Sequence, residues 1–192
     1  VERTYPQFSP DGKELAFIED RNRLMVLNLD TKKVRQVTDG STWYSTGGGF
    51  DYSWSPDGKW FTLEFIGNRH DPYSDIGLVS AQGDSPIVNL TNSGYTSGSP
   101  RFVLDGNAIL FTTERYGMRA HASWGSQDDA MLVFLNQDAY DKFCLSKEDY
   151  ELRKELEAEQ KKAKEKTGDK AKDKKKDNKK EKEDDAAKVK DI

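Results

Sequence analysis

Short runs of alternating apolar and polar residues recur from residue 5 to residue 135, and turn-forming residues separate them. Runs of this length that are rich in Val, Ile, Phe, Tyr and Trp predict β-strands. Three turns of one kind divide the runs, and each recurs 46 and then 48 positions after the one before it: Asp11-Gly12, Asp57-Gly58 and Asp105-Gly106. Asp caps its own backbone and Gly supplies the positive φ that closes such a turn. A period in the high forties with one such hairpin per repeat is typical of β-propeller blades.

The predicted strands form three successive groups, of four, four and three. They lie at residues 5–8, 15–18, 24–29 and 34–37, then 51–54, 60–65, 76–81 and 87–90, and finally 100–103, 108–112 and 130–135. Four strands in meander order make one blade. The predicted fold class is therefore all-β: a partial β-propeller of about three four-stranded blades, the third incomplete. Because three blades are too few to close a ring, we expect the chain to be part of a longer protein.

The predicted domain of blades covers residues 1–136, with repeats near 5–38, 51–91 and 100–135. Composition changes beyond it. Residues 1–146 hold 13 basic and 19 acidic side chains, whereas residues 147–192 hold 17 basic and 15 acidic ones and a single aromatic, Tyr150. The second part has too few apolar groups to offset the entropy of ordering a chain.

Residues 137–166 are predicted to be a charged helical insertion. Ser146 and Asp149 have the spacing of a capping box, and a thin apolar stripe of Tyr150, Leu152, Leu156 and Ala163 follows them. Residues 167–192 have no hydrophobic period and are predicted to be a disordered linker rich in Lys, Asp and Glu.

Several classes of function lack their sequence signals. The chain has no nucleophile elbow, zinc-protease helix or phosphate-binding loop, so no catalytic residue, cofactor or metal site is predicted. Acidic residues interleave with the lysines of the charged segment, which argues against nucleic-acid binding. No apolar run is long enough to span a membrane. Cys144 is the single cysteine, and the redox compartment stays open.

The loops between the second and third strands carry the candidate binding residues. From turn glycine to third strand these segments lengthen from 12 to 18 to 24 residues, and they share one face of a propeller with the blade-to-blade connections. Long loops on a rigid scaffold often hold binding sites. The predicted site residues are Arg69, His70, Tyr73, Arg115, Arg119, His121 and Trp124. The alternative is that these loops pack on one another and their arginines hold carboxylates of a neighbouring blade.

Two acid–arginine pairs occupy equivalent repeat positions, Asp20-Arg21 and Glu114-Arg115. A pair that recurs at one repeat position favours a structural role, and we expect it to bridge blades.

The repeated motif, Phe8 to Lys13 and Trp54 to Lys59, resembles the WD40-like repeat of TolB-like proteins and tricorn proteases. The stretch from Thr113 to Ser126, which runs into the strand at 130–135, is more similar to bacterial tricorn-type peptidases of the S41 class. The resemblance covers residues 1–145. It implies a non-catalytic propeller that filters or guides peptides, with the catalytic Ser and His in a domain far beyond this segment. None of those catalytic residues can be placed on this sequence.

Three functions remain open at this point. The first is a propeller segment of a tricorn-like serine protease, with peptides and the remaining blades and catalytic domain as partners. The second is a TolB-like periplasmic adaptor that binds another protein. The third is a propeller enzyme with its own site around His70 and His121. The first implies a cytoplasmic location and the second a periplasmic one, and a homo-oligomer is compatible with each.

Overall fold

A computed structural model describes residues 1–44, 48–67, 72–118 and 126–160. The chain divides into two compact units, Val1–Tyr140 and Asp141–Ile192. Within its described residues, the first unit contains eleven strands in three antiparallel sheets. The predicted disordered linker at 167–192 lies outside the described residues.

Each sheet is a meander in which neighbours in sequence are neighbours in space. The first contains β1 (Arg3–Phe8), β2 (Glu14–Glu19), β3 (Arg23–Asn28) and β4 (Val34–Gln36). The second contains β5 (Tyr52–Trp54), β6 (Trp60–Phe65), β7 (Asp75–Ser80) and β8 (Val88–Asn89). Both sheets follow the strand plan that the repeat predicts.

The third sheet has three strands in the described part of the chain. They are β9 (Ser97–Val103), β10 (Ala108–Thr113) and β11 (Asp129–Phe134). Where a fourth strand would start, the chain enters the short helix α1 (Gln137–Phe143). Asn136 Oδ1 accepts the backbone N–H of Ala139 at 2.8 Å and so caps this helix. The prediction of an incomplete third blade is confirmed.

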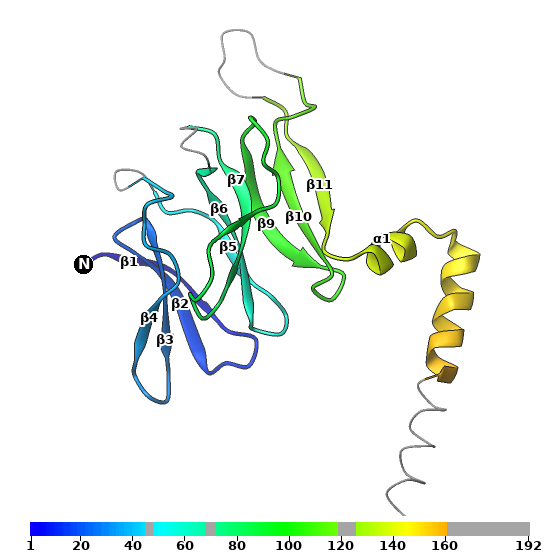
Figure 1. Ribbon diagram of the computed structural model, residues 1–192, viewed down its shortest axis with the longest axis horizontal. Helices are drawn as coiled ribbons and strands as arrows, with labels where there is room; N and C mark the ends of the chain where they lie inside the picture. Colours follow the sequence, from blue (N-terminus) through cyan, green and yellow to red (C-terminus); the bar gives the residue numbers. More distant parts are fainter. Residues whose placement is uncertain (45–47, 68–71, 119–125, 161–192) are drawn as a thin grey trace, which may run out of the picture. The chain divides into compact units, whose positions relative to one another are not determined.

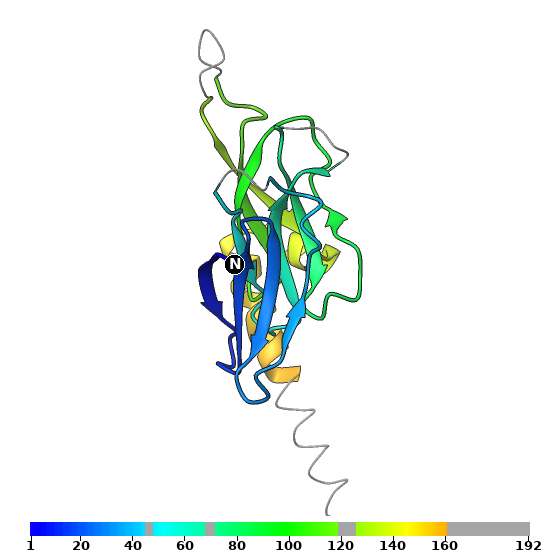
Figure 2. The same cartoon turned by 90° about the vertical axis from the view of Figure 1, so that its left-hand side faces the viewer.

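The three sheets stand side by side in chain order, as the two views show (Figure 1, Figure 2). The Asp-Gly turns at β1–β2, β5–β6 and β9–β10 lie at one end of the sheets, which we call the turn end. The connections β2–β3, β6–β7 and β10–β11 lie at the other, which we call the long-loop end. The chain also passes from sheet to sheet at the long-loop end. The architecture is a partial β-propeller.

The main core lies between the first two sheets. Ile18, Leu24 and Phe61 are fully buried there, and the Trp54 and Phe61 rings lie 4.0 Å apart. Trp54 Nε1 also donates to the carbonyl of Gln7 in the first sheet, at 3.3 Å. Phe8 occupies the same repeat position one blade earlier and is 66% exposed, because no sheet of the described chain packs on that side.

The second unit is helical in its described part. After a break at residues 144–146, a helix covers residues 147–160, where the described part ends. Ser146 Oγ accepts the N–H of Asp149 at 3.2 Å, which is the N-cap bond of the predicted capping box, and the same hydroxyl donates to the Asp149 carboxylate at 2.8 Å. Lys142 and Arg153 both bind the carboxylate of Glu157. Among the described residues no helix is long and apolar enough to cross a membrane.

Candidate functional site

The long-loop end carries the residues that the sequence predicts as a binding site. Tyr73 follows β6 and is 45% exposed, and Arg115 follows β10 with its guanidinium 5.2 Å from the centre of the Tyr116 ring. Tyr116 and Met118 are also exposed. These side chains offer one cation and three apolar surfaces to solvent. The other predicted residues, Arg69, His70, Arg119, His121 and Trp124, lie outside the described residues.

The blade-to-blade loop at the same end is used differently. Trp43 is half-buried, packs edge-to-face on Phe50 and Tyr44, and donates its indole N–H to the carbonyl of Gly48 at 3.2 Å. The aromatic part of this loop therefore closes the core between the first two sheets. In this loop, aromatic residues pack against the protein, which is the alternative to ligand binding that the sequence allows for the loops.

Beneath the long-loop end, a pair of carboxylates joins the second and third sheets. Glu64 at the end of β6 accepts the backbone N–H of Ser99 at 2.7 Å and that of Asp51 at 3.3 Å. Ser99 Oγ in turn donates to the Asp51 carboxylate at 3.1 Å. Burial raises the pKa of Glu64, and the nearby Asp51 carboxylate acts in the same direction. The two carboxylates thus join the sheets, and the burial of Glu64 disfavours its charged form.

Sequence reasoning missed this cluster, although the repeat contains a signal for it. Glu64 occupies the repeat position of Ile18, 46 residues earlier, and of Thr112, 48 residues later. The second blade therefore has an acidic residue where the first has an apolar one and the third a neutral one. Ser99 lies in a β-bulge of β9 and has a φ of 52°. An acidic residue in an inward strand position calls for a partner from another element, and Ser99 supplies it.

At the turn end, two Asp-Gly turns have the same internal hydrogen bonds. Ser9 Oγ donates to Asp11 and Ser55 Oγ donates to Asp57, both at 2.6 Å. Each aspartate also accepts the backbone N–H of the lysine two positions later in the chain. The hydroxyl bond and this backbone bond lower the pKa of Asp11 and of Asp57. Gly12 and Gly58 have positive φ, at 72° and 69°.

The third turn closes differently. Gly106 has a φ of 84°, and Leu104 and Asp105 before it also have positive φ. Asn107 Nδ2 donates to the carbonyl of Leu104 at 2.8 Å and helps to close the turn. This worn copy lacks both the Ser and the Pro of the other two, which explains its altered backbone.

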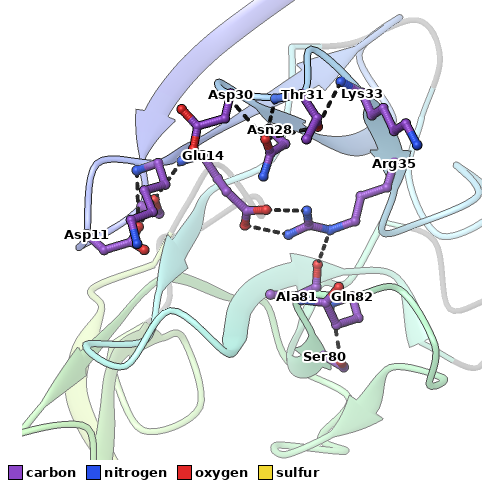
Figure 3. Close-up of polar contacts among 12 residues, drawn as sticks. Asp11, Glu14, Asn28, Asp30, Thr31, Lys33, Arg35, Ser80, Ala81 and Gln82 are labelled. Atoms are coloured by element: carbon purple, nitrogen blue, oxygen red, sulfur yellow. Dashed lines mark hydrogen bonds and ion pairs between the residues drawn. The ribbon is translucent and has the colours of Figure 1, made fainter.

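Arg35 on β4 links the first sheet to the second (Figure 3). Its Nη atoms donate to both carboxylate oxygens of Glu14 at 2.5 and 2.6 Å, and its Nε donates to the carbonyl of Ala81 at 2.8 Å. The hydrogen bond from Arg35 holds the pKa of Glu14 below its ordinary value. The guanidinium of Arg35 therefore has a structural role.

The acid–arginine pairs expected to bridge blades do not do so in the first blade. Arg21 binds Glu2 at 2.9 Å, and Asp20 binds Arg23 at 2.5 Å, all within the first sheet. Asp20 and Arg21 both have positive φ and form the tight β2–β3 turn. Their short connection keeps them over their own sheet.

The described residues contain no group of three or more His, Cys, Asp or Glu placed to hold a metal ion. What they do provide at the long-loop end is a rigid sheet base with exposed aromatic and cationic side chains above it. Such an arrangement can bind a ligand.

Comparison with known proteins places this fold. No protein-family model matches the chain. The chain is 27% identical over 108 residues to a Sulfurisphaera tokodaii protein named as a tricorn-like protease C-terminal subunit, and 31% identical over 121 residues to the uncharacterized peptidase YuxL of Bacillus subtilis. These matches cover 56% and 58% of the chain but only 12% and 17% of the two relatives. The chain therefore spans a small part of the length of each.

Among solved structures, the crystal structure of the tricorn protease matches 71% of the chain with a TM-score of 0.55 and 16% identity. The chain therefore has a partial-propeller fold and is similar to tricorn-type proteins in sequence and in structure. It covers 14% of that structure. The AtxE2 isopeptidase with a bound astexin gives a TM-score of 0.50 at 15% identity, over 70% of this chain and 28% of its own. These two similarities, at 16% and 15% identity, show the fold of the chain.

Proposed function

We propose that this tricorn-like segment is the non-catalytic propeller portion of a larger peptidase and binds or gates peptide substrates at its long-loop end. The observation that carries the proposal is the convergence of the lengthening β2–β3, β6–β7 and β10–β11 connections at that end, where Tyr73, Arg115 and Tyr116 are exposed. The similarity to tricorn-like and other peptidases supports it.

Each side chain has a role in this proposal. Arg115, with Arg69 and Arg119, supplies hydrogen bonds to peptide carbonyls and carboxylates. Tyr73 and Trp124 supply flat apolar surface for peptide side chains, and His70 and His121 supply further polar contacts. The catalytic residues and the other blades belong to the rest of the parent chain in this proposal.

Peptide binding to the purified chain tests the proposal. A fluorescently labelled, unstructured acidic peptide is titrated with wild type and with the double variant Arg115→Ala, Arg119→Ala, and anisotropy reports binding. We expect the variant to bind roughly tenfold more weakly, because hydrogen bonds to charged groups are lost. Lys33→Ala removes a cation from the turn end and serves as the matched control.

Two results would contradict the proposal. Equal affinity of wild type and the double variant would assign the arginines to packing. Hydrolysis of the peptide by this chain alone would show that the segment is itself an enzyme. Circular dichroism of each variant verifies that the sheets remain folded.

A further inference from the structure

The turn end carries a cavity at each junction between sheets, and equivalent repeat positions line both. The cavity between the first two sheets has a volume of about 270 Å³ and is lined by Ser9, Pro10, Asp11, Glu14, Pro56, Asp57 and Gly58. The cavity between the second and third sheets is larger, about 440 Å³. Six residues of this second cavity lie one repeat after six residues that line the first cavity. They are Ser55, Pro56, Asp57, Trp60, Asp105 and Gly106.

One substitution within the repeat makes the two cavities chemically different. Glu14 of the first blade corresponds to Trp60 of the second, 46 residues later. Both carboxylate oxygens of Glu14 are bound by Arg35, so the charge of Glu14 in the wall of the first cavity is already paired. Trp60 is 40% exposed and leaves its indole in the wall of the second cavity.

The second cavity combines this aromatic wall with an acidic rim. Leu78, Phe102 and Leu135 complete the apolar lining of the cavity. The acidic rim consists of Asp57, from the second sheet, and Asp105, from the third. Asp57 Oδ1 accepts hydrogen bonds from Ser55 Oγ and from the N–H of Lys59, which keep this carboxylate ionised at neutral pH. Asp57 and Asp105 are both exposed, so a ligand can reach their charge.

We propose that this cavity binds the side chain of an arginine in a peptide or protein partner. The guanidinium would lie against the Trp60 indole, with Asp57 and Asp105 supplying the opposite charge and Leu78 and Phe102 contacting the methylenes. Arginine fits better than lysine because its planar guanidinium stacks on aromatic rings and loses less hydration. The charge is complementary at longer range as well, since residues 1–146 hold six more acidic than basic side chains.

The cavity lies at the end opposite to the long loops, so this site is separate from the proposed peptide-binding face. The two can therefore be tested independently with variants at either end.

The test uses the peptide acetyl-Leu-Arg-Leu-amide and the same peptide with citrulline, which keeps the shape of arginine without its charge. Isothermal titration calorimetry with the full 192-residue chain measures both. We expect the arginine peptide to bind at least fivefold more tightly, and Trp60→Leu and Asp105→Asn each to weaken it about fivefold, as one cation–π or ionic contact supplies. Asp30→Asn, a carboxylate on the β3–β4 turn outside the cavity, should leave binding unchanged.

Equal binding of the two peptides, or unchanged binding by both variants, would overturn the assignment. If Trp60→Leu fails to fold, Asp105→Asn decides alone. Sedimentation of the peptide-free chain tests another occupant: a dimer that Trp60→Leu abolishes would assign the cavity to a second copy and overturn the arginine site.

Discussion

Arg35 and Ala81, which lie on different sheets, are joined by a hydrogen bond of 2.8 Å from the guanidinium Nε to the backbone carbonyl. The same guanidinium holds Glu14 through its other two nitrogens. One side chain therefore joins β4 to β2 across the first sheet and joins the first sheet to the second. Only the forked geometry of arginine serves three acceptors in this way.

Arg35→Lys should lower the free energy of unfolding by about 1–3 kcal/mol, because lysine cannot reproduce the bidentate pair and the bond to Ala81 together. Urea denaturation at pH 7 measures the loss. The control is Arg21→Lys, which affects an exposed pair with Glu2 and should cost less than about 0.5 kcal/mol. Equal losses in the two variants would contradict the role assigned to Arg35.

Glu14→Gln should reveal a pH-dependent contribution. The bond to Arg35 holds the pKa of Glu14 in the folded chain below its value in the unfolded chain. Its ionised form therefore stabilises the fold above the ordinary glutamate pKa of about 4.3, and this stability is lost as the pH falls through the lowered pKa. We expect the advantage of wild type over the variant to be largest at pH 7 and to shrink below about pH 4. Denaturation at both pH values measures it.

Glu64→Gln should behave in the opposite way. Burial raises the pKa of Glu64, so the folded chain holds a proton at pH values where the unfolded chain has released it. Stability from this group is therefore present at low pH and lost as the pH rises from the ordinary glutamate value through the raised one. We expect the stability of the variant relative to wild type to increase between about pH 4 and pH 7. A difference that stays flat over this range would show that Glu64 does not titrate as described.

Trp54→Ala and Phe8→Ala compare one repeat position in two environments. Trp54 is 8% exposed between two sheets, whereas Phe8 is 66% exposed. We expect the first substitution to cost about 3–5 kcal/mol and the second less than about 1 kcal/mol. Thermal unfolding followed by circular dichroism separates them. A large loss for Phe8→Ala would indicate that something covers the outer side of the first sheet in solution.

Gly106→Ala tests the worn turn against Gly12→Ala. Both glycines have positive φ, at 84° and 72°, so alanine is strained at each position. A Cβ at Gly106 would also lie 3.1 Å from Pro56 Cδ, whereas a Cβ at Gly12 would meet no atom within 4 Å. We expect a loss of about 1 kcal/mol for Gly12→Ala and a larger one for Gly106→Ala. A smaller loss at Gly106 would mean that the third turn moves away from the second sheet.

Much of the fold could be predicted from the sequence because its signals are local. The turn at Asp57-Gly58 and the apolar run at 60–65 lie next to each other, and β6 has the predicted bounds. The candidate site was less predictable. Glu64 and Ser99 are 35 residues apart, and their contact depends on how two sheets pack. Trp43 lies in a loop whose aromatic composition is compatible with a binding role. Its edge-to-face packing on Phe50 shows that Trp43 belongs to the core.

By itself, the sequence determined the repeat, the strand order and the end at which the long loops gather, since hairpin turns and period-two alternation act between near neighbours. The tertiary structure decided which faces are covered and which charges meet. Phe8 and Trp54 have the same local pattern, yet one is exposed and the other buried, because a blade is buried only where another blade stands beside it. The same is true of Arg35 and Glu64, because each has one partner, Ala81 or Ser99, in a neighbouring sheet that no local rule of the chain specifies.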